Sequence, residues 1–344
     1  MVYCPPEKTI VTGCARYDLC SSQWRRTLGE EAADYILVNA NFSLVNPLLS
    51  SGEAAVKTTF KSVGHADAFI DELYSDTLVV FHRFLGEIRR IAATHKSERF
   101  VVRPHPFERP EMYEEYLKDL PNVCVDPHGD VLTAILRAKA VLHVNCGSAV
   151  EANLLRRVPL HLQYLSTPLQ DDYTPLPRRL SLCLSSPDHL DRTLSNIDVV
   201  KAAYDFAGQQ SATLVPFFGP LDGRAARRVA EQLTDLAACE PNSAAGRLGW
   251  AARSGITKPS IGQMFQGAIG TVFGTRVLAS LRSIRQPSCG TKRFNVQDVN
   301  RLLAGFAHCT GGAPESAKPA RHPFLGMPLE SLIIDSSKAP FCHA

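Results

Sequence analysis

The tetrapeptide Arg103-Pro104-His105-Pro106 combines residue types that suit the binding of a phosphate group. An arginine presents a permanently charged fork of N–H donors whose geometry matches phosphate. A histidine donates from a ring nitrogen and adds positive charge when it is protonated. The two prolines restrict the backbone, so the loop loses little entropy when it closes on an anion. A rigid turn with a solvated arginine and histidine is the alternative explanation of the same four residues.

A second group of residues, 143–151, places a Gly-Ser turn before an expected helix. Gly147 lets the backbone approach a ligand closely, and Ser148 is a favourable N-cap residue. The first amides of the helix and its positive end form a cradle for phosphate. Glu151, one turn into the helix, is placed to accept hydrogen bonds from ribose hydroxyls. The nucleotide-binding residues predicted here are Asn145, Gly147, Ser148, Ala149 and Glu151.

The segments that must position these two motifs alternate between short apolar runs and amphipathic stretches. The continuous apolar character of the runs is typical of strands that are covered on both faces. Such strands are expected at 35–39, 100–103, 123–125, 140–144, 160–162 and 181–184. Helices are expected at 66–94, 111–119, 130–138, 148–156, 187–207 and 222–238. This alternation predicts an α/β fold with a doubly wound, parallel, Rossmann-like sheet.

Polar residues that follow the strands are candidates for a binding cleft, because ligands bind at the carboxyl ends of strands in open parallel sheets. Asn39, Asn41 and Asn46 accompany the first strand. They either line the cleft or serve as caps and turns, and Asn41 is included in the predicted nucleotide site. Arg103 ends the second strand, His105 follows it, and these two are the predicted catalytic residues.

Other titratable residues have less distinctive surroundings in the sequence. His128 and Asp130 lie near the expected nucleotide base but also fit a turn and a helix N-cap. His161, at a strand, is expected to be a core or edge histidine. Asp18 and Glu108 are candidate bases by proximity alone, and each is expected to be a solvated loop carboxylate.

The chain divides by composition into a lead-in (1–34), a nucleotide-binding domain (35–240) and a tail of low periodicity (241–344). The tail is rich in Gly, Pro, Ser and Ala, so it is expected to be irregular and partly helical. Residues 263–285 predict one amphipathic helix. This helix either docks on the main domain or lies on a membrane surface or a partner protein.

Composition excludes several classes of protein. The 37 Lys and Arg residues nearly balance 34 Asp and Glu residues, which does not suggest a nucleic-acid binder. The ten cysteines form no Cys-x-x-Cys pair, which favours a reducing compartment without structural zinc. Asp171-Asp172 lacks a third metal ligand and is expected to be a solvated loop, so no metal site is predicted. With no signal region and no apolar stretch of about 20 residues, a cytoplasmic protein is expected, with peripheral attachment to the inner membrane face left open.

The chain resembles bacterial surface-carbohydrate (capsule and lipopolysaccharide) biosynthesis proteins of the GT-B group. This group includes CDP-glycerol glycerophosphotransferases and Kdo, sialyl- and polysialyltransferases with a His-Pro motif. The resemblance covers about residues 8–240. The matching segments are 11–18, 36–42, 103–106, 145–152 and 222–226.

The resemblance implies the C-terminal, nucleotide-binding half of a GT-B fold. It also implies that Arg103 and His105 hold the donor phosphate, that Ser148 and its neighbours bind phosphate, and that Glu151 faces the ribose. The implied activity is metal-independent transfer from a CMP- or CDP-activated sugar or glycerol to a carbohydrate or lipid-linked acceptor. No separate cofactor is implied.

The chain departs from this family in two respects. Cys14-Ala15 stands where the family usually has Asn-Pro. The family's catalytic base and acceptor site lie in an N-terminal half, and this chain begins almost at the linker between the halves. The chain is therefore expected either to be a fragment or to need a partner chain that supplies the missing lobe; alternatively, the protein is a non-catalytic nucleotide-binding or scaffold subunit of a polysaccharide assembly complex. A sugar epimerase of related architecture is a third alternative, which would require UDP and a second lobe.

Overall fold

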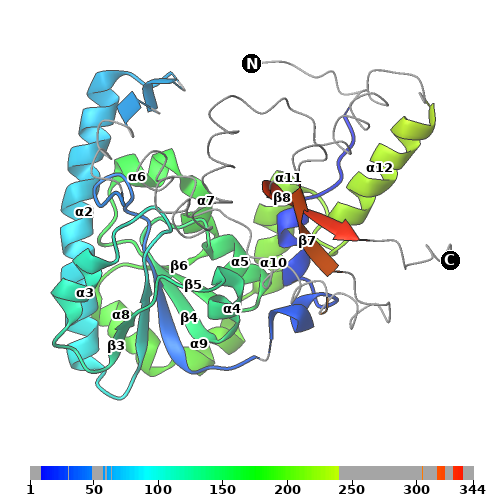
Figure 1. The fold of residues 1–344 in the computed structure, drawn as a ribbon. Coiled ribbons are helices and arrows are strands. Elements are labelled where there is room, and N and C mark those ends of the chain that lie inside the picture. Colours follow the sequence, from blue (N-terminus) through cyan, green and yellow to red (C-terminus); the bar gives the residue numbers. More distant parts are fainter. Residues whose placement is uncertain are drawn as a thin grey trace. The chain divides into compact units, whose positions relative to one another are not determined.

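The structure is a computed structural model that describes most of the first 239 residues and parts of the remainder. The described residues are 9–29, 31–48, 57–58, 60–62, 64–239, 304, 316–321 and 328–335. The chain divides into two compact units, Met1–Gly223 and Arg224–Ala344 (Figure 1).

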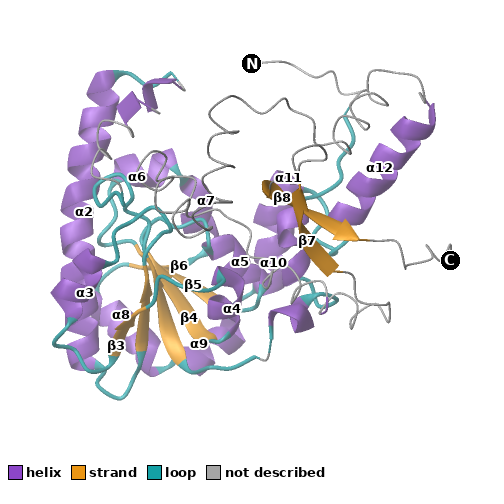
Figure 2. Ribbon diagram, viewed as in Figure 1, coloured by secondary structure: helices purple, strands orange, loops and turns teal. Residues whose placement is uncertain are grey.

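The first unit contains a six-stranded, entirely parallel sheet with helices on both faces (Figure 2). The spatial order is β3-β2-β1-β4-β5-β6, which is the strand order of Rossmann-like folds. All six predicted strands are confirmed, with boundaries that shift by at most two residues. The strands are β1 (Tyr35–Asn39), β2 (Phe100–Arg103), β3 (Val123–Val125), β4 (Ala138–His143), β5 (Val158–Leu162) and β6 (Leu182–Leu184).

Alternate strand residues enter two separate hydrophobic cores, one on each face of the sheet. Ile36 and Val38 of β1 point into one core, whereas Leu37 points into the other. The first core is covered by α2 (Asp67–Thr94), α3 (Glu111–Leu117), α8 (Pro187–Ser195) and α9 (Ile197–Ala203). The second is covered by the 3-10 helices η2 (Ala15–Cys20) and η3 (Arg25–Leu28), with α4 (Val131–Leu136) and α5 (Ala149–Leu154). The doubly wound fold is thereby confirmed.

Several helix predictions were wrong in extent, and those at 111–119 and 148–156 run two residues past the ends of α3 and α5. The predicted helix 187–207 breaks at Asn196, whose backbone (φ −126°, ψ 32°) is not helical. The predicted helix 130–138 ends at Leu136, because Ala138 already pairs with Tyr35 as the first residue of β4. Short helices after β5 and α9 were not predicted; they are α6 (Pro168–Tyr173), α7 (Pro175–Leu180), α10 (Phe206–Gln209), the π-helical turn η4 (Gln210–Leu214) and α11 (Val215–Phe218).

Specific contacts hold the segment before β1 against the rest of the first unit. The indole N–H of Trp24 donates to the carbonyl of Gly223 (2.9 Å), and Arg25 donates to the carbonyl of Leu154 (3.1 Å). Gly223 has a φ of +74°, and a Cβ at this position would lie 2.3 Å from Oγ of Ser21. Only glycine fits this turn without displacing its neighbour.

The second unit is described in three elements. The helix α12 (Ala225–Cys239) confirms the helix predicted at 222–238. Strands β7 (Ser316–Arg321) and β8 (Pro328–Asp335) form an antiparallel pair within the stretch that was expected to be irregular. The apolar, β-branched run in β8 favours a strand and was the sequence signal for it. The predicted helix 263–285 lies outside the described residues.

Candidate functional site

The candidate site lies at the carboxyl edge of the sheet, where the loops after β1, β2 and β4 meet. In the observed strand order, the direction of winding reverses between β1 and β4. The connections that follow two neighbouring strands run in opposite directions there, which leaves a crevice between them. Ligands bind in this crevice in open parallel sheets. Asn39 ends β1, and residues 144–148 follow β4.

Two hydrogen bonds cross this switch point between the β1 and β4 loops. The side-chain amide of Asn39 donates to Oγ of Ser148 (2.7 Å), and that of Asn41 donates to the carbonyl of Asn145 (2.8 Å). Asn39 is buried, whereas Asn41 is exposed. The structure therefore brings the predicted residues Asn41, Asn145 and Ser148 together at one place.

The turn before α5 differs in detail from the expected cradle. Ser148 occupies the N-cap position, but its side chain makes no capping hydrogen bond. Its hydroxyl instead accepts from Asn39 and lies 3.0 Å from the thiol of Cys146. The N–H of Ala149 donates to the carbonyl of Cys146 within the turn, so it is not directed at a ligand. Burial raises the pKa of the Cys146 thiol, which therefore stays protonated.

Gly147 is the most open residue of the turn. It is exposed, and a Cβ built at this position would meet no atom within 4 Å. Its N–H makes no hydrogen bond with any residue that the structure describes. Because its φ is not in the left-handed region, glycine is not required here by the backbone conformation. Open space and an available amide are what the approach of a ligand to this turn needs.

Glu151 is buried, in contrast to the solvent-facing carboxylate that ribose binding suggested. Only 1% of it is exposed, and its Oε1 accepts a hydrogen bond from Arg16 of η2. Its Oε2 is buried without a partner among the described residues. Burial, and to a smaller extent this carboxylate, raises the pKa of Tyr17 to about 12. Contact with the ribose remains a prediction, and the observed partner of Glu151 is the segment before β1.

Arg103 ends β2 and His105 follows it, and their side chains have different neighbours. The guanidinium of Arg103 donates to the carbonyls of His128 and Gly129, in the loop after β3. Since β3 and β1 flank β2 on opposite sides, these bonds direct Arg103 away from the switch point. His105 is half-buried, and its Nδ1 accepts from the N–H of Phe107 (3.3 Å). In the neutral ring, the proton is therefore assigned to Nε2.

Glu108 was expected to be a solvated carboxylate, and this expectation was wrong. Only 2% of it is exposed, and its Oε1 accepts from the N–H groups of Phe42 (2.6 Å) and His105 (3.3 Å). Its Oε2 accepts from the hydroxyl of Tyr113. Burial raises the pKa of Glu108 to about 7, although these hydrogen bonds oppose the shift. Glu108 therefore joins the β1 loop to the His-Pro loop.

The available sequence signal for Glu108 was its spacing. A glutamate three residues after a turn's first residue can reach back to that residue's N–H, as in a helix capping box. Glu108 does so at His105, and its own N–H donates to the carbonyl of His105 (2.8 Å). Asn46 strengthens the same junction, because its amide donates to the carbonyl of Arg109 (2.9 Å).

Asp130 and His128 are turn and cap residues. Asp130 is the N-cap of α4 and accepts from the N–H of Thr133 (2.9 Å), which confirms its capping role. The N–H of His128 donates to Asp126 (2.9 Å).

Asp171 was wrongly expected to lie in a solvated loop. It lies in the first turn of α6, and 14% of its side chain is exposed. Its carboxylate accepts a hydrogen bond from the hydroxyl of Ser166 (2.7 Å) and pairs with Arg178 (3.4 Å). Asp18, another candidate base, is 9% exposed and also not a solvated carboxylate. Among the described residues, no group of three His, Cys, Asp or Glu side chains could hold a metal ion.

Two buried histidines lie on β4 and β5. His161 is 1% exposed, which confirms the expected core position, and its ring centroid lies 5.7 Å from that of His143. His143 is fully buried, and its Nε2 lies 2.8 Å from Oγ of Ser181. Its Nδ1 accepts from the N–H of Cys146 (3.4 Å), so Nε2 is the donor to Ser181. Burial lowers the pKa of His143 to about 3.

Comparison with known proteins identifies no family. No family model matches the chain, and no curated protein matches it in sequence. Solved structures that share some of its architecture include the wall teichoic acid polymerase TagF (H444N variant; 12% identity, TM-score 0.39, covering 70% of this chain and 55% of that one). Another is UDP-GlcNAc 2-epimerase from Neisseria meningitidis bound to UDP-GlcNAc (13% identity, TM-score 0.33, covering 67% and 56%). This chain spans little more than half the length of either structure.

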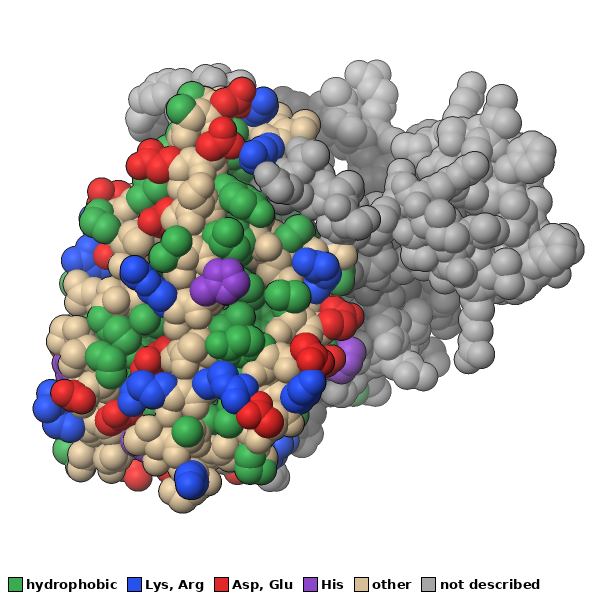
Figure 3. Space-filling model, turned by 90° about the vertical axis from the view of Figure 1, so that its left-hand side faces the viewer, with side chains coloured by type: hydrophobic (Ala, Val, Ile, Leu, Met, Phe, Trp, Pro, Cys, Tyr) green, Lys and Arg blue, Asp and Glu red, His purple; other side chains and the backbone are tan. Residues whose placement is uncertain are grey.

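None of the described helices is both long and apolar enough to cross a membrane. On the face of the molecule that Figure 3 shows, Lys and Arg side chains are interspersed with Asp and Glu. Arg89 of α2 pairs with Asp119. Such mixed charge does not provide this face with a binding surface for a polyanion.

Proposed function

We propose that the first unit binds the nucleotide of an activated donor in the crevice between β1 and β4, and that the protein is a glycosyltransferase or glycerophosphotransferase of surface-polysaccharide synthesis. The observation that carries this proposal is the pair of hydrogen bonds from Asn39 and Asn41 across the switch point. These bonds hold the Gly147 turn beside the β1 loop. The strand order supports the same location, because ligands bind at such switch points.

The donor is proposed to be a CMP- or CDP-activated sugar or glycerol, following the resemblance of the His-Pro and Gly-Ser segments to the GT-B group. The N–H of Gly147 is placed to donate to a phosphate oxygen. His105, with its proton on Nε2, is proposed to stabilise charge on the leaving phosphate, and such stabilisation is commonly the largest catalytic contribution. Glu108 acts as a positioning residue, because it holds the N–H of His105 and does not face the reacting atoms.

The location is tested by calorimetric titration of the chain with CMP, CDP, UDP and GDP. A Gly147→Val variant should fold normally, since a Cβ there meets nothing within 4 Å, but it should fill the space that the ligand needs. We expect cytidine nucleotides to bind best and the variant to lose about tenfold or more in affinity, or about 1.4 kcal/mol. Gly86→Ala is the matched control, because a Cβ at Gly86 of α2 also meets nothing within 4 Å.

The activity is tested by donor transfer or hydrolysis with the chain alone and with any lobe that its genomic neighbourhood encodes. We expect His105→Ala to lower turnover about a hundredfold, the usual effect of removing one donor to a developing negative charge. Normal turnover in that variant would exclude His105 from the mechanism. Nucleotide binding without turnover in either preparation would instead favour a non-catalytic nucleotide-binding subunit. Equal affinity of Gly147→Val and the wild type would refute the proposed location.

A further inference from the structure

A pocket lies in the first unit, apart from the candidate site, and is formed by residues of α7, α10, η4 and α11 together with Asp205. Its volume is about 630 Å³, which is in the range of small-molecule sites. The residues that line it come from elements that the sequence did not predict and that the proposed function does not use. They are Arg179, Asp205, Gly208, Gln209, Ala212, Thr213 and Phe217.

One side of this pocket is formed by a π-helical turn that comes shortly before a proline. An unbroken α-helix from Phe206 to Phe218 would need an N–H at residue 216 to donate to the carbonyl of Ala212. Pro216 has no N–H, so this hydrogen bond cannot form. The chain instead forms the π-helical turn η4, in which the N–H of Val215 donates to the carbonyl of Gln210. Such turns are rare and occur frequently at functional sites. Gln209 and Thr213 remain side by side, with Oγ1 of Thr213 donating to Oε1 of Gln209 (3.4 Å).

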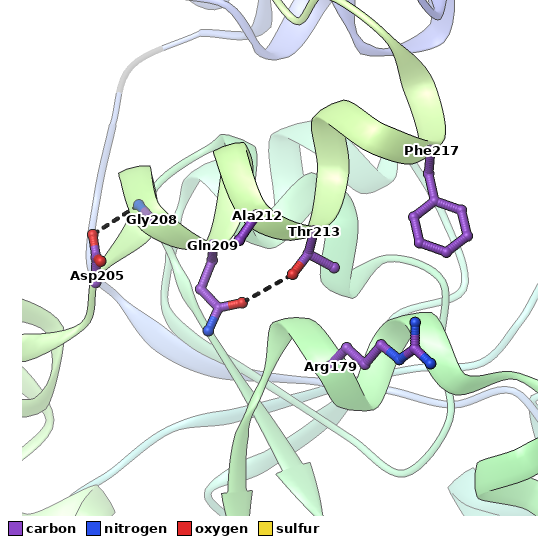
Figure 4. A pocket seen from close by; sticks show the side chains of 7 residues that line it. All are labelled: Arg179, Asp205, Gly208, Gln209, Ala212, Thr213 and Phe217. Carbon is purple, nitrogen blue, oxygen red and sulfur yellow. Dashed lines mark hydrogen bonds between the residues drawn. The ribbon is translucent and has the colours of Figure 1, made fainter.

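The charged groups of the pocket lie at opposite ends (Figure 4). Arg179 and the Phe217 ring lie toward one end, and Asp205 lies toward the other. Arg179 is exposed and makes no hydrogen bond or ion pair with any residue in the described part of the chain. Phe217 is 57% exposed, so its ring is accessible to a ligand.

The other end of the pocket offers hydrogen-bonding groups. Asp205 accepts from the N–H of Gly208 through Oδ1 (2.8 Å). A Cβ at residue 208 would lie 2.0 Å from Oδ2 of Asp205, so glycine leaves room for this carboxylate. The amide of Gln209 and the hydroxyl of Thr213 lie between the two ends. A carboxylate, an amide and a hydroxyl are suitable partners for several hydroxyl groups of one ligand.

From this arrangement we infer that the pocket binds an acidic sugar. Arg179 would pair with the ligand's carboxylate, Phe217 would cover an apolar face of the sugar ring, and Asp205, Gln209 and Thr213 would bond its hydroxyls. A nucleoside diphosphate fits less well, because Arg179 supplies one positive charge and Asp205 repels a second anionic group. The ligand is either a free acidic monosaccharide or the end of an acidic polysaccharide, and its binding does not require the nucleotide site.

The test is an NMR titration of the full chain, with the methyl groups of Ala212 and Thr213 as reporters inside the pocket. The probes are glucuronic acid, trigalacturonic acid and, as the neutral comparison, glucose. We expect both acids to shift these two methyl signals and glucose to shift them at least tenfold more weakly. Tighter binding of the trisaccharide would assign the pocket to a chain end, and equal binding would assign it to the free sugar.

Variants separate this site from the nucleotide site. Arg179→Ala should weaken binding of glucuronic acid about tenfold or more, as expected for loss of a hydrogen bond to a charged group. Arg83→Ala is the matched control, because Arg83 is an exposed arginine on α2. Arg179→Ala should leave CMP binding unchanged, whereas Gly147→Val should leave glucuronic acid binding unchanged. Equal affinity for glucose and glucuronic acid, an unaffected Arg179→Ala variant, or methyl shifts caused by CMP would overturn the inference.

Discussion

Glu108 shows how much the environment of a single residue adds to its type. In the sequence it is one acidic residue in a loop. In the structure it is buried and accepts hydrogen bonds from two backbone N–H groups and a tyrosine. Burial of a carboxyl cannot be derived from its neighbours in the chain, because Phe42 and Tyr113 approach it only in the folded sheet. The same reason explains why the ion pair of Glu151 with Arg16 was not predicted.

The raised pKa of Glu108 predicts a dependence of stability on pH. Folding raises this pKa from 4.5 to about 7, so the folded protein retains a proton that the unfolded chain releases between these values. The resulting stabilisation is complete below pH 4.5 and is lost as the pH rises through 7, a change of about 3 kcal/mol.

A Glu108→Gln variant isolates this contribution, since its amide oxygen still accepts from Phe42 and His105 but does not ionise. Urea unfolding followed by circular dichroism at pH 5 and pH 8 measures the free energies of unfolding. Between these values the wild type should lose about 2–3 kcal/mol relative to the variant. If the difference between the two proteins is the same at both pH values, the carboxyl titrates normally.

At the scale of elements, the sequence predicted the sheet better than the helices around it. Each buried strand is a continuous apolar run between polar segments, and such a run can be recognised in the sequence without knowing its tertiary contacts. The short helices α6 and α7 have six residues each, too few to show a helical period. Their proline starts, Pro168 and Pro175, were the available signals. The candidate site was predictable as the carboxyl edge of the sheet, whereas side-chain directions such as that of Arg103 depend on which loop lies beside it.

Thr174, between α6 and α7, links these unpredicted helices to the site. Its hydroxyl donates to Oδ1 of Asn145. The carbonyl of Asn145 in turn accepts a hydrogen bond from the side-chain amide of Asn41. Thr174→Val keeps the shape of the side chain and removes this bond, so the β4 loop should hold its position less well. We expect stability to fall by about 1 kcal/mol.

Nucleotide affinity should fall about threefold to tenfold in the same Thr174→Val variant, a change of about 0.7–1.4 kcal/mol. The control is Thr94→Val, which removes a hydroxyl bond to Arg90 at the end of α2. Calorimetry on both variants measures the nucleotide dissociation constant, and urea unfolding measures stability. Equal dissociation constants for the two variants would show that Thr174 does not position the site.

At the scale of the whole molecule, the closed packing of the sheet on both faces determines how the protein responds to acid. His143 lies in β4, the fourth strand of the spatial order, and has no solvent exposure. Burial keeps the ring neutral, because charging it would place an ion inside the core. His161 on the neighbouring strand also has its pKa lowered, chiefly by burial.

Acid should therefore unfold the first unit through its buried histidines. The pKa of His143 falls from 6.5 to about 3 on folding, so only the unfolded chain binds this proton between those values. The stabilisation that comes from burying the neutral ring is present above pH 6.5 and is lost as the pH falls toward 3, at about 1.4 kcal/mol for each pH unit well below 6.5.

His143→Gln keeps a donor for Ser181 but cannot be protonated. The variant should therefore be less stable than the wild type at pH 7 and should lose less stability between pH 6.5 and 4.5. The comparison uses urea unfolding at several pH values in the Glu108→Gln background, which removes the opposing titration of that carboxyl. Equal slopes with and without His143, or a His143 Cε1–H signal that titrates above pH 5 in NMR spectra, would show that the ring can be charged without opening the sheet.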